Sequence, residues 1–322
     1  PPPFFFFFFF FFLVVQELNR YHDILANPRT RVPLSDGRYI NANFVRDLTG
    51  KRKKYIAAQG PLPGTVPDFM QMVWEQRVPA IVMVTNLHEG GRAKCARYFP
   101  GREGSCMQFG DIYVTLTACK QMSGFLCNTL RLQCGKETRE VLHFWYTTWP
   151  DHGVPQAADG KIFTRDVLLM MHEVRKFMAT VRTDAPMVVH CSAGIGRSGA
   201  IIAIDTGMDA IEAGQYVDLL DVTRQMRQDR MAMIQHSSQY KFACYTVASF
   251  ALQMLKRRAA GGAGGTAPAA GAAQPAARPT QPSRPAPVAP APAGDLWVTT
   301  SAFSNPDNTP DVLVFKAMNK KK

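Results

Sequence analysis

One segment, residues 187–204, constrains the fold of this chain more than any other. A short apolar strand at residues 187–189 leads into the loop His-Cys-Ser-Ala-Gly-Ile-Gly-Arg-Ser-Gly at 190–199, and an apolar run follows at 200–204. A strand, a glycine-rich loop and the first turn of a buried helix form an anion cradle, because backbone N–H groups and the helix N-terminus point into the loop. The segment therefore predicts a strand–loop–helix unit within an α/β domain.

Two side chains of this loop have the chemistry to act on a bound phosphate. Arg197 offers a planar fork that can grip two oxygens of a tetrahedral anion. Cys191 stands where the same positive field favours its thiolate, the form that attacks phosphorus. A structural cysteine beside a glycine turn is the alternative, but the complete string Cys-x5-Arg-Ser-Gly favours a nucleophile in a phosphate-binding loop.

The pattern of apolar residues in the rest of the chain predicts a mixed sheet with helices packed on it. In nine segments, apolar residues recur at helical spacing, alternate with polar ones, or follow one another in a short run. We expect helices at residues 67–76, 161–182, 196–213, 217–227 and 238–255, and strands at 80–84, 112–118, 130–134 and 140–146.

Charge and cysteine usage narrow the classes of function. Half of the net charge of +12 belongs to residues 256–322, which leaves the preceding part only modestly basic. Such a domain suits acidic, phosphorylated partners, and no basic-aromatic stripe indicates nucleic acid. The seven cysteines form no C-x-x-C pair, which favours a reducing compartment and a cytoplasmic location.

Both ends of the chain have unusual composition, which predicts the domain boundaries. Residues 1–12 are three prolines and nine phenylalanines; with residues 13–15 the apolar stretch is too short to span a bilayer and lacks signal-peptide features. We expect this stretch to be non-native sequence, the alternative being the stub of a membrane anchor on a longer protein. Residues 258–322, largely Ala, Pro and Gly, read as a disordered basic tail. The folded domain is therefore expected at residues 13–257.

A second motif, Trp-Pro-Asp-His-Gly-Val-Pro at residues 149–155, accompanies the loop, and together they resemble the tyrosine-specific protein phosphatase family. The resemblance covers roughly residues 18–255. It implies an α/β fold, a highly twisted mixed β-sheet flanked by helices, with the active-site cleft ringed by loops. The other matching strings are Asn-Arg-Tyr at 19–21, Tyr-Ile-Asn-Ala-Asn at 39–43, Gln-Gly-Pro at 59–61, Lys-Cys-x2-Tyr-x-Pro at 94–100 and Gln-x3-Gln-Tyr at 235–240.

The resemblance implies a phosphocysteine mechanism. Cys191 would attack phosphorus, and Asp151 would protonate the departing tyrosyl oxygen and later accept a proton from water. Gln235 would position that water with help from Gln239. His190 would order the loop, and Ser198 would stabilise Cys191 as a leaving group. The phosphate oxygens would be held by Arg197 and by the backbone N–H groups of Ser192, Ala193, Gly194, Ile195 and Gly196.

The same resemblance implies how the substrate is recognised. Tyr21 would form the wall against which the phosphotyrosine ring stacks, Ile24 would line the pocket, and Asp23 would hold the substrate backbone. Glu89 would pair with the loop arginine, and Lys94 would lie near the acid loop. The alternative for each of these residues is a solvated charge or a satisfied surface residue, and the resemblance favours the role in recognition.

The sequence leaves three hypotheses of function open. The leading one is a monomeric enzyme that hydrolyses phosphotyrosine in proteins, with no cofactor and no metal. A catalytically silent phosphotyrosine-binding module is the second, although Cys191, Arg197 and Asp151 are all present. A dual-specificity or low-molecular-weight phosphatase is the third, but such chains are shorter and lack the Tyr21 wall. The composition does not support membrane association.

Overall fold

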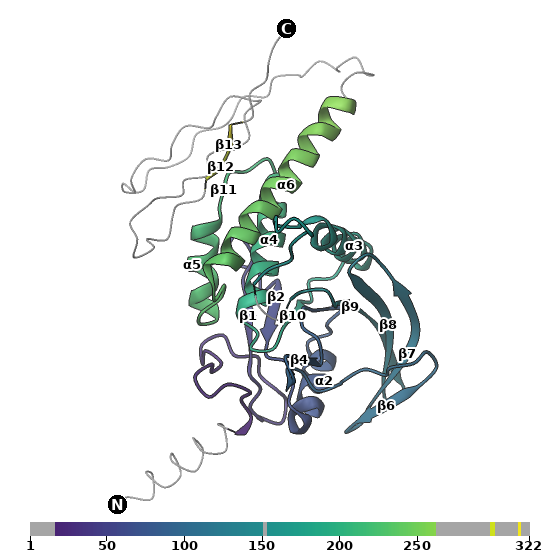
Figure 1. The fold of residues 1–322 in the computed structure, drawn as a ribbon. Helices are drawn as coiled ribbons and strands as arrows, with labels where there is room; N and C mark the ends of the chain where they lie inside the picture. The colour runs from purple at the N-terminus through teal and green to yellow at the C-terminus, as the bar shows by residue number, and fades with distance from the viewer. Residues whose placement is uncertain (1–16, 151–152, 262–296, 300–314, 317–322) are drawn as a thin grey trace, which may run out of the picture.

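In the computed structural model, residues 17–150, 153–261, 297–299 and 315–316 are described. Their main feature is an eight-stranded mixed sheet of order β1-β2-β10-β3-β9-β8-β7-β6 (Figure 1). The expected twisted mixed sheet with helices on it is confirmed. In chain order its strands are β1 (Ala42–Val45), β2 (Tyr55–Ala58), β3 (Ala80–Met83), β6 (Cys106–Phe109), β7 (Ile112–Gln121), β8 (Phe125–Cys134), β9 (Glu137–Tyr146) and β10 (Met187–His190).

The middle of the sheet is parallel and its flanks are antiparallel. Strand β10 pairs in parallel with β2 and β3, and β3 pairs in parallel with β9. All four residues of β10 are buried, as expected for a strand covered on both faces. The loop that follows β10 therefore emerges at the carboxyl end of a central parallel strand, where open α/β sheets place their ligands.

Helices cover both faces of the sheet (Figure 1). Alternate side chains of β3 separate the two cores: Ala80 and Val82 pack with α3 to α6, whereas Ile81 and Met83 pack with α2. This alternation follows from the period-2 geometry of a strand. The helices are α2 (Val66–Glu75), α3 (Arg165–Val181), α4 (Gly196–Glu212), α5 (Leu219–Asp229) and α6 (Ser237–Gly261), with a 3₁₀ turn η1 (Pro63–Thr65) before α2.

Two helices begin later than the sequence predicts, each for a local reason. Helix α3 starts at Arg165 rather than 161, because the preceding residues bridge back to the segment at 155–157; the N–H of Phe163 donates to the Pro155 carbonyl at 2.9 Å. Helix α5 starts at Leu219 rather than 217, because Asp218 caps it by accepting from the N–H of Leu220 at 2.8 Å.

Most of the two predicted terminal segments lies outside the described residues, including all of residues 1–12. Helix α6 continues past the predicted boundary to Gly261. Beyond it, β12 (Trp297–Thr299) pairs with β11 (Val217–Asp218) and with β13 (Phe315–Lys316). Within the part of the chain that the structure describes, no helix combines the length and the apolar character needed to cross a membrane.

Candidate active site

The loop between β10 and α4 curls around the sulfur of Cys191. Cys191 is 5% exposed, and the N–H of Gly194 donates to its Sγ at 3.2 Å. Gly194 has φ +72°, and a Cβ at this position would lie 2.1 Å from the carbonyl oxygen of Ala58. Only glycine fits such a backbone beside β2, so the glycine of the loop motif has a direct structural cause.

Arg197, in the first turn of α4, is fixed by a two-pronged ion pair with Glu89. Its Nη1 and Nη2 lie 2.6 and 2.9 Å from the two carboxylate oxygens. Glu89 belongs to the small hairpin of β4 (His88–Glu89) and β5 (Arg92–Ala93). Burial disfavours the charged carboxylate, but hydrogen bonds from Arg197 and from the N–H of Asn86 outweigh it and hold the pKa of Glu89 below its ordinary value. The pair presets the guanidinium in one orientation.

The segment carrying the predicted general acid approaches this arginine. Arg197 Nη2 donates to the carbonyl of Pro150 at 3.2 Å. The neighbouring Trp149 is buried, donates from Nε1 to the Gly153 carbonyl at 3.2 Å, and packs on Phe242 of α6. Asp151 itself lies outside the described residues. Residues 149, 150 and 153, which flank the undescribed pair 151–152, are thus held against the loop and the core.

Behind the loop, three buried rings form a hydrogen-bonded chain from the Cys191 carbonyl into the core. Nδ1 of His190 lies 3.2 Å from the Cys191 carbonyl, and its Nε2 lies 2.7 Å from the hydroxyl of Tyr98. That hydroxyl lies 2.9 Å from Nε2 of His143, whose Nδ1 faces the side-chain amide of Asn128 at 3.1 Å.

The direction of every hydrogen bond in this chain follows from the neutrality of its histidines. Burial lowers the pKa of His190 to about 4 and that of His143 well below its ordinary value. A neutral His190 that donates from Nδ1 to a carbonyl must accept at Nε2. The Tyr98 hydroxyl therefore donates to His190 and accepts from His143, which in turn accepts from Asn128. The arrangement orients the loop, and the one ring proton of His190 is already donated to the Cys191 carbonyl.

The segment predicted to recognise substrate lies beside the loop. The hydroxyl of Tyr21 is 2.9 Å from Oγ of Ser192, which links the predicted wall to the phosphate loop. Ile24 is buried in the same core as Cys191, whereas Asp23 is exposed. Arg20, which the sequence did not single out, anchors the segment by donating to the carbonyls of Gly60, Pro61 and Ala93.

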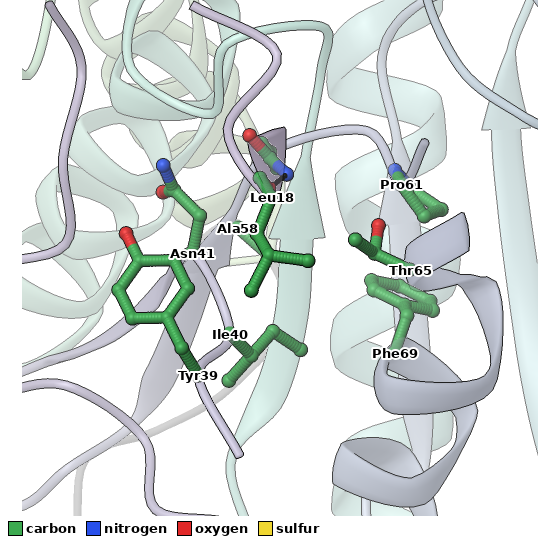
Figure 2. Close-up of a pocket in the computed structure, with 9 residues that line it drawn as sticks. Leu18, Tyr39, Ile40, Asn41, Ala58, Pro61, Thr65 and Phe69 are labelled. Atoms are coloured by element: carbon green, nitrogen blue, oxygen red, sulfur yellow. Dashed lines mark hydrogen bonds between the residues drawn. The ribbon is translucent and has the colours of Figure 1, made fainter. Parts of the chain in front are cut away.

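The start of this segment, at Leu18, packs closely against the residues around Gln59. The side-chain amide of Gln59 donates to the carbonyl of Leu18 at 2.8 Å. A cavity of about 10 Å³ remains, room for one water. Figure 2 shows Tyr39, Ile40 and Asn41 on one wall of this cavity and Pro61, Thr65 and Phe69 on the other.

The two predicted glutamines lie where α5 turns toward α6. Oε1 of Gln239 accepts from the N–H of Gln235 at 3.1 Å, and the side chain of Gln235 is exposed. Ile234, just before it, has φ +60°, an outlier for a β-branched residue. The N–H of Ile234 donates to the Ile195 carbonyl at 3.1 Å, and the carbonyl of Ile234 accepts from the Arg227 side chain at 2.9 Å. The strained backbone is thus tied to the loop.

Ser198 and Lys94 complete the predicted set. Oγ of Ser198 is buried and has no hydrogen-bond partner among the described residues, which is rare for a buried hydroxyl and typical of functional positions. The N–H of Lys94 donates to the Leu87 carbonyl at 2.8 Å, so that Lys94 follows directly on the hairpin that holds Glu89.

Arg230 is the main element of the site that sequence reasoning missed. It is completely buried and donates to the carbonyls of Ala193 and Gly194 and to the side-chain oxygens of Asn41 and Asn43, at 2.7 to 3.0 Å. All four partners are neutral, and burial lowers the pKa of Arg230 to about 10. The two asparagines lie about 190 residues away in sequence, so the only available signal was the string at 39–43, whose partner no pattern identifies.

The described residues therefore contain a cysteine loop of the phosphate-binding type, at the end of a central parallel strand in an α/β sheet. Nowhere in them do three His, Cys, Asp or Glu side chains gather as metal ligands. Residues 15–249 match the family model for protein-tyrosine phosphatase, and the chain belongs to that family.

Individual relatives agree with this assignment. The chain is 40% identical to human tyrosine-protein phosphatase non-receptor type 7 over 242 residues, covering 73% of this chain and 64% of that protein. It is 40% identical to mouse receptor-type tyrosine-protein phosphatase R over 239 residues, covering 72% of this chain and 35% of the relative. The relatives thus include non-receptor and receptor types, and this chain spans less than two thirds of their length.

Two solved structures of one relative match the fold. The catalytic domain of human protein tyrosine phosphatase non-receptor type 18 gives a TM-score of 0.66 at 37% identity, covering 72% of this chain and 84% of that one. The same phosphatase in complex with HER2 phosphopeptides also gives 0.66, at 36% identity, covering 73% of this chain and 81% of that one.

Proposed function

We propose that this chain hydrolyses phosphotyrosine in proteins, as a cytoplasmic enzyme or as the cytoplasmic part of a longer one. The observation that carries the proposal is the arrangement around Cys191: a backbone N–H on its sulfur, Arg197 preset by Glu89, and Tyr21 linked to Ser192 at the rim. The phosphopeptide complex of the non-receptor type 18 phosphatase supports the same class of substrate.

In the first step the Cys191 thiolate attacks phosphorus in line with the tyrosyl oxygen. An S–P bond forms while the P–O bond to the ring breaks, and Asp151 donates its proton to the departing phenolate. Arg197 and the loop N–H groups hold the phosphoryl oxygens, and their hydrogen bonds strengthen as charge spreads in the transition state. The proposed wall at Tyr21 fits a long phosphotyrosine side chain, whereas phosphoserine would leave its phosphorus short of Cys191.

In the second step water releases the phosphate. Asp151, now ionised, accepts a proton from a water positioned by Gln235 and Gln239. The water oxygen bonds to phosphorus as the S–P bond breaks, and the electron pair returns to Cys191. The unpartnered hydroxyl of Ser198 is available to donate to the leaving sulfur. General acid–base assistance of this kind typically accelerates a step by about 10²–10⁴-fold.

The test compares turnover of a phosphotyrosyl peptide by the unmodified chain and by Cys191→Ser. The variant should lose hydrolysis while still binding the peptide. Cys244→Ser is the matched control, because Cys244 is also 5% exposed but lies on α6, and it should retain turnover. An unmodified chain that binds the peptide without hydrolysing it would be a silent binding module. Equal rates on phosphothreonyl peptides would contradict tyrosine specificity.

A further inference from the structure

A second cavity, of about 590 Å³, lies at the β1 edge of the sheet. This volume falls within the range of ligand pockets. Its walls come from the loop before β1, from β1 and the turn after it, and from the end of α2. Five cationic side chains line it: Arg29, Arg31, Arg46, Lys51 and Lys53. We call these five residues the basic pocket.

The positive charge of the basic pocket is largely uncompensated. Among the described residues, no acidic side chain lines the cavity. Arg46 pairs with Asp229 at 2.9 Å, but the other four cations form no ion pair with any residue that the structure describes. Four unpaired cations around one concave volume create a local potential that attracts an anion.

Aromatic contacts hold two of these cations in place. Nζ of Lys53 lies 4.4 Å from the centre of the Phe44 ring, and the guanidinium of Arg31 lies 5.5 Å from that of Tyr39. The charges come from separate segments spread around the cavity. A single phosphate site usually combines converging donors with backbone N–H groups. The observed spread fits several carboxylates spaced along a peptide.

The basic pocket is also within reach of the candidate active site. Four residue steps separate Ile24, at the predicted phosphotyrosine pocket, from Pro28 in the cavity wall. Their Cα atoms are therefore at most about 15 Å apart, a distance that about five extended residues span. In addition, Asp229, which holds Arg46, immediately precedes Arg230, which holds the Ala193 and Gly194 carbonyls.

We propose that the basic pocket binds an acidic stretch of the same protein substrate whose phosphotyrosine occupies the Cys191 loop. The proposal rests on the proposed function, and it adds a substrate preference to it. The acidic stretch would lie about five residues from the phosphotyrosine, and its carboxylates would face Arg29, Arg31, Lys51 and Lys53.

The test uses paired phosphotyrosyl peptides with three glutamates, or three glutamines, starting five residues from the phosphotyrosine on either side. The unmodified chain should prefer the glutamate peptide in kcat/KM by about three- to tenfold at low salt, and 0.5 M salt should abolish the preference. Arg29→Gln with Lys51→Gln should remove most of it. Lys120→Gln with Lys136→Gln, exposed cations near the other edge of the sheet, should retain it.

The affinity of the Cys191→Ser variant for the glutamate and glutamine peptides, measured by fluorescence anisotropy, reports binding without hydrolysis. It therefore tests the basic pocket independently of the proposed function. Turnover without glutamate preference would refute the basic pocket and leave hydrolysis standing. Glutamate-dependent binding without turnover by the unmodified chain would refute hydrolysis and support the pocket. The pocket would also be refuted by an equal loss of preference in the Lys120/Lys136 variant. Sedimentation with phosphatidylserine vesicles that requires Arg29 and Lys51, with no peptide preference, would assign the pocket to membranes instead.

Discussion

Replacing Tyr98 by phenylalanine tests the hydrogen-bonded chain that supports the cysteine loop. The hydroxyl is fully buried, and burial raises the pKa of Tyr98 well above its ordinary value, so it stays a donor at any physiological pH. Tyr98→Phe keeps the ring and removes two hydrogen bonds, of 2.7 Å to His190 and 2.9 Å to His143. An acceptor on one histidine and a donor on the other are then left unsatisfied in the core.

The expected cost follows from these two orphaned groups. Each unsatisfied buried polar group costs about 1–3 kcal/mol, so the loss of two partners should lower the free energy of unfolding by about 2–6 kcal/mol. Tyr113→Phe is the matched control, since Tyr113 is 44% exposed and its change should stay within about 0.5 kcal/mol. Denaturant unfolding followed by fluorescence measures both variants.

The same substitution should also affect the loop, because His190 holds the Cys191 carbonyl. We expect the rate of phosphotyrosyl peptide hydrolysis to fall in Tyr98→Phe and not in Tyr113→Phe. A stability loss below about 1 kcal/mol relative to the control would show that the tyrosine hydroxyl does not bridge the two histidines, and the assigned hydrogen-bond directions would be wrong.

Three further predictions concern other parts of the site. The pKa of His190, about 4 when folded against 6.5 ordinarily, means that only the unfolded chain gains a proton between these values. The free energy of unfolding should therefore fall by about 2 kcal/mol from pH 7 to pH 5 because of this group. In His190→Gln, denaturation measured at both pH values should show a fall that is smaller by this amount. Gly194→Ala should abolish hydrolysis, because its Cβ would meet the Ala58 carbonyl, whereas Gly64→Ala, which meets nothing within 4 Å, should hydrolyse normally. Ala232→Gly should stabilise the fold by about 1 kcal/mol, because Ala232 has φ +55°; an unchanged unfolding midpoint would contradict this.

The sequence predicted the long elements and some, but not all, of the short buried strands. Helix α4 and the antiparallel β7–β8–β9 meander were expected close to their observed positions, although β8 begins at Phe125 rather than 130. Strands β1 and β2 were not expected. Each has four residues, all buried, and shows no alternation. Strands β3 and β10 are equally short and buried, but their runs of large apolar residues, Ile-Val-Met and Met-Val-Val, predicted them. The Asn in β1 and the two Ala in β2 break such a run.

For the site, the sequence identified the side chains expected to meet the phosphate and, through the resemblance, Glu89 and His190 as supports, but it did not identify the supporting roles of Tyr98 and Arg230. Cys191 and Arg197 lie within seven residues of one another, so their spacing alone carries a signal. The supports come from far along the chain: Tyr98 reaches His190 across 92 positions, and Arg230 reaches Asn41 across 189. Such contacts depend on tertiary packing, which local spacing does not encode.

The electrostatics of these supports favour an anion bound in the loop. The histidines behind the loop are held neutral by burial, and the carboxylate of Glu89 is already committed to Arg197 by two hydrogen bonds. Arg230, by contrast, is buried with neutral partners alone, so its positive charge is not cancelled by a carboxylate. A buried, unpaired cation against the Ala193 and Gly194 carbonyls is costly unless an anion shares the same low-dielectric region. An anion bound in the loop between β10 and α4, such as a phosphate, would supply that charge and offset the cost of burying Arg230.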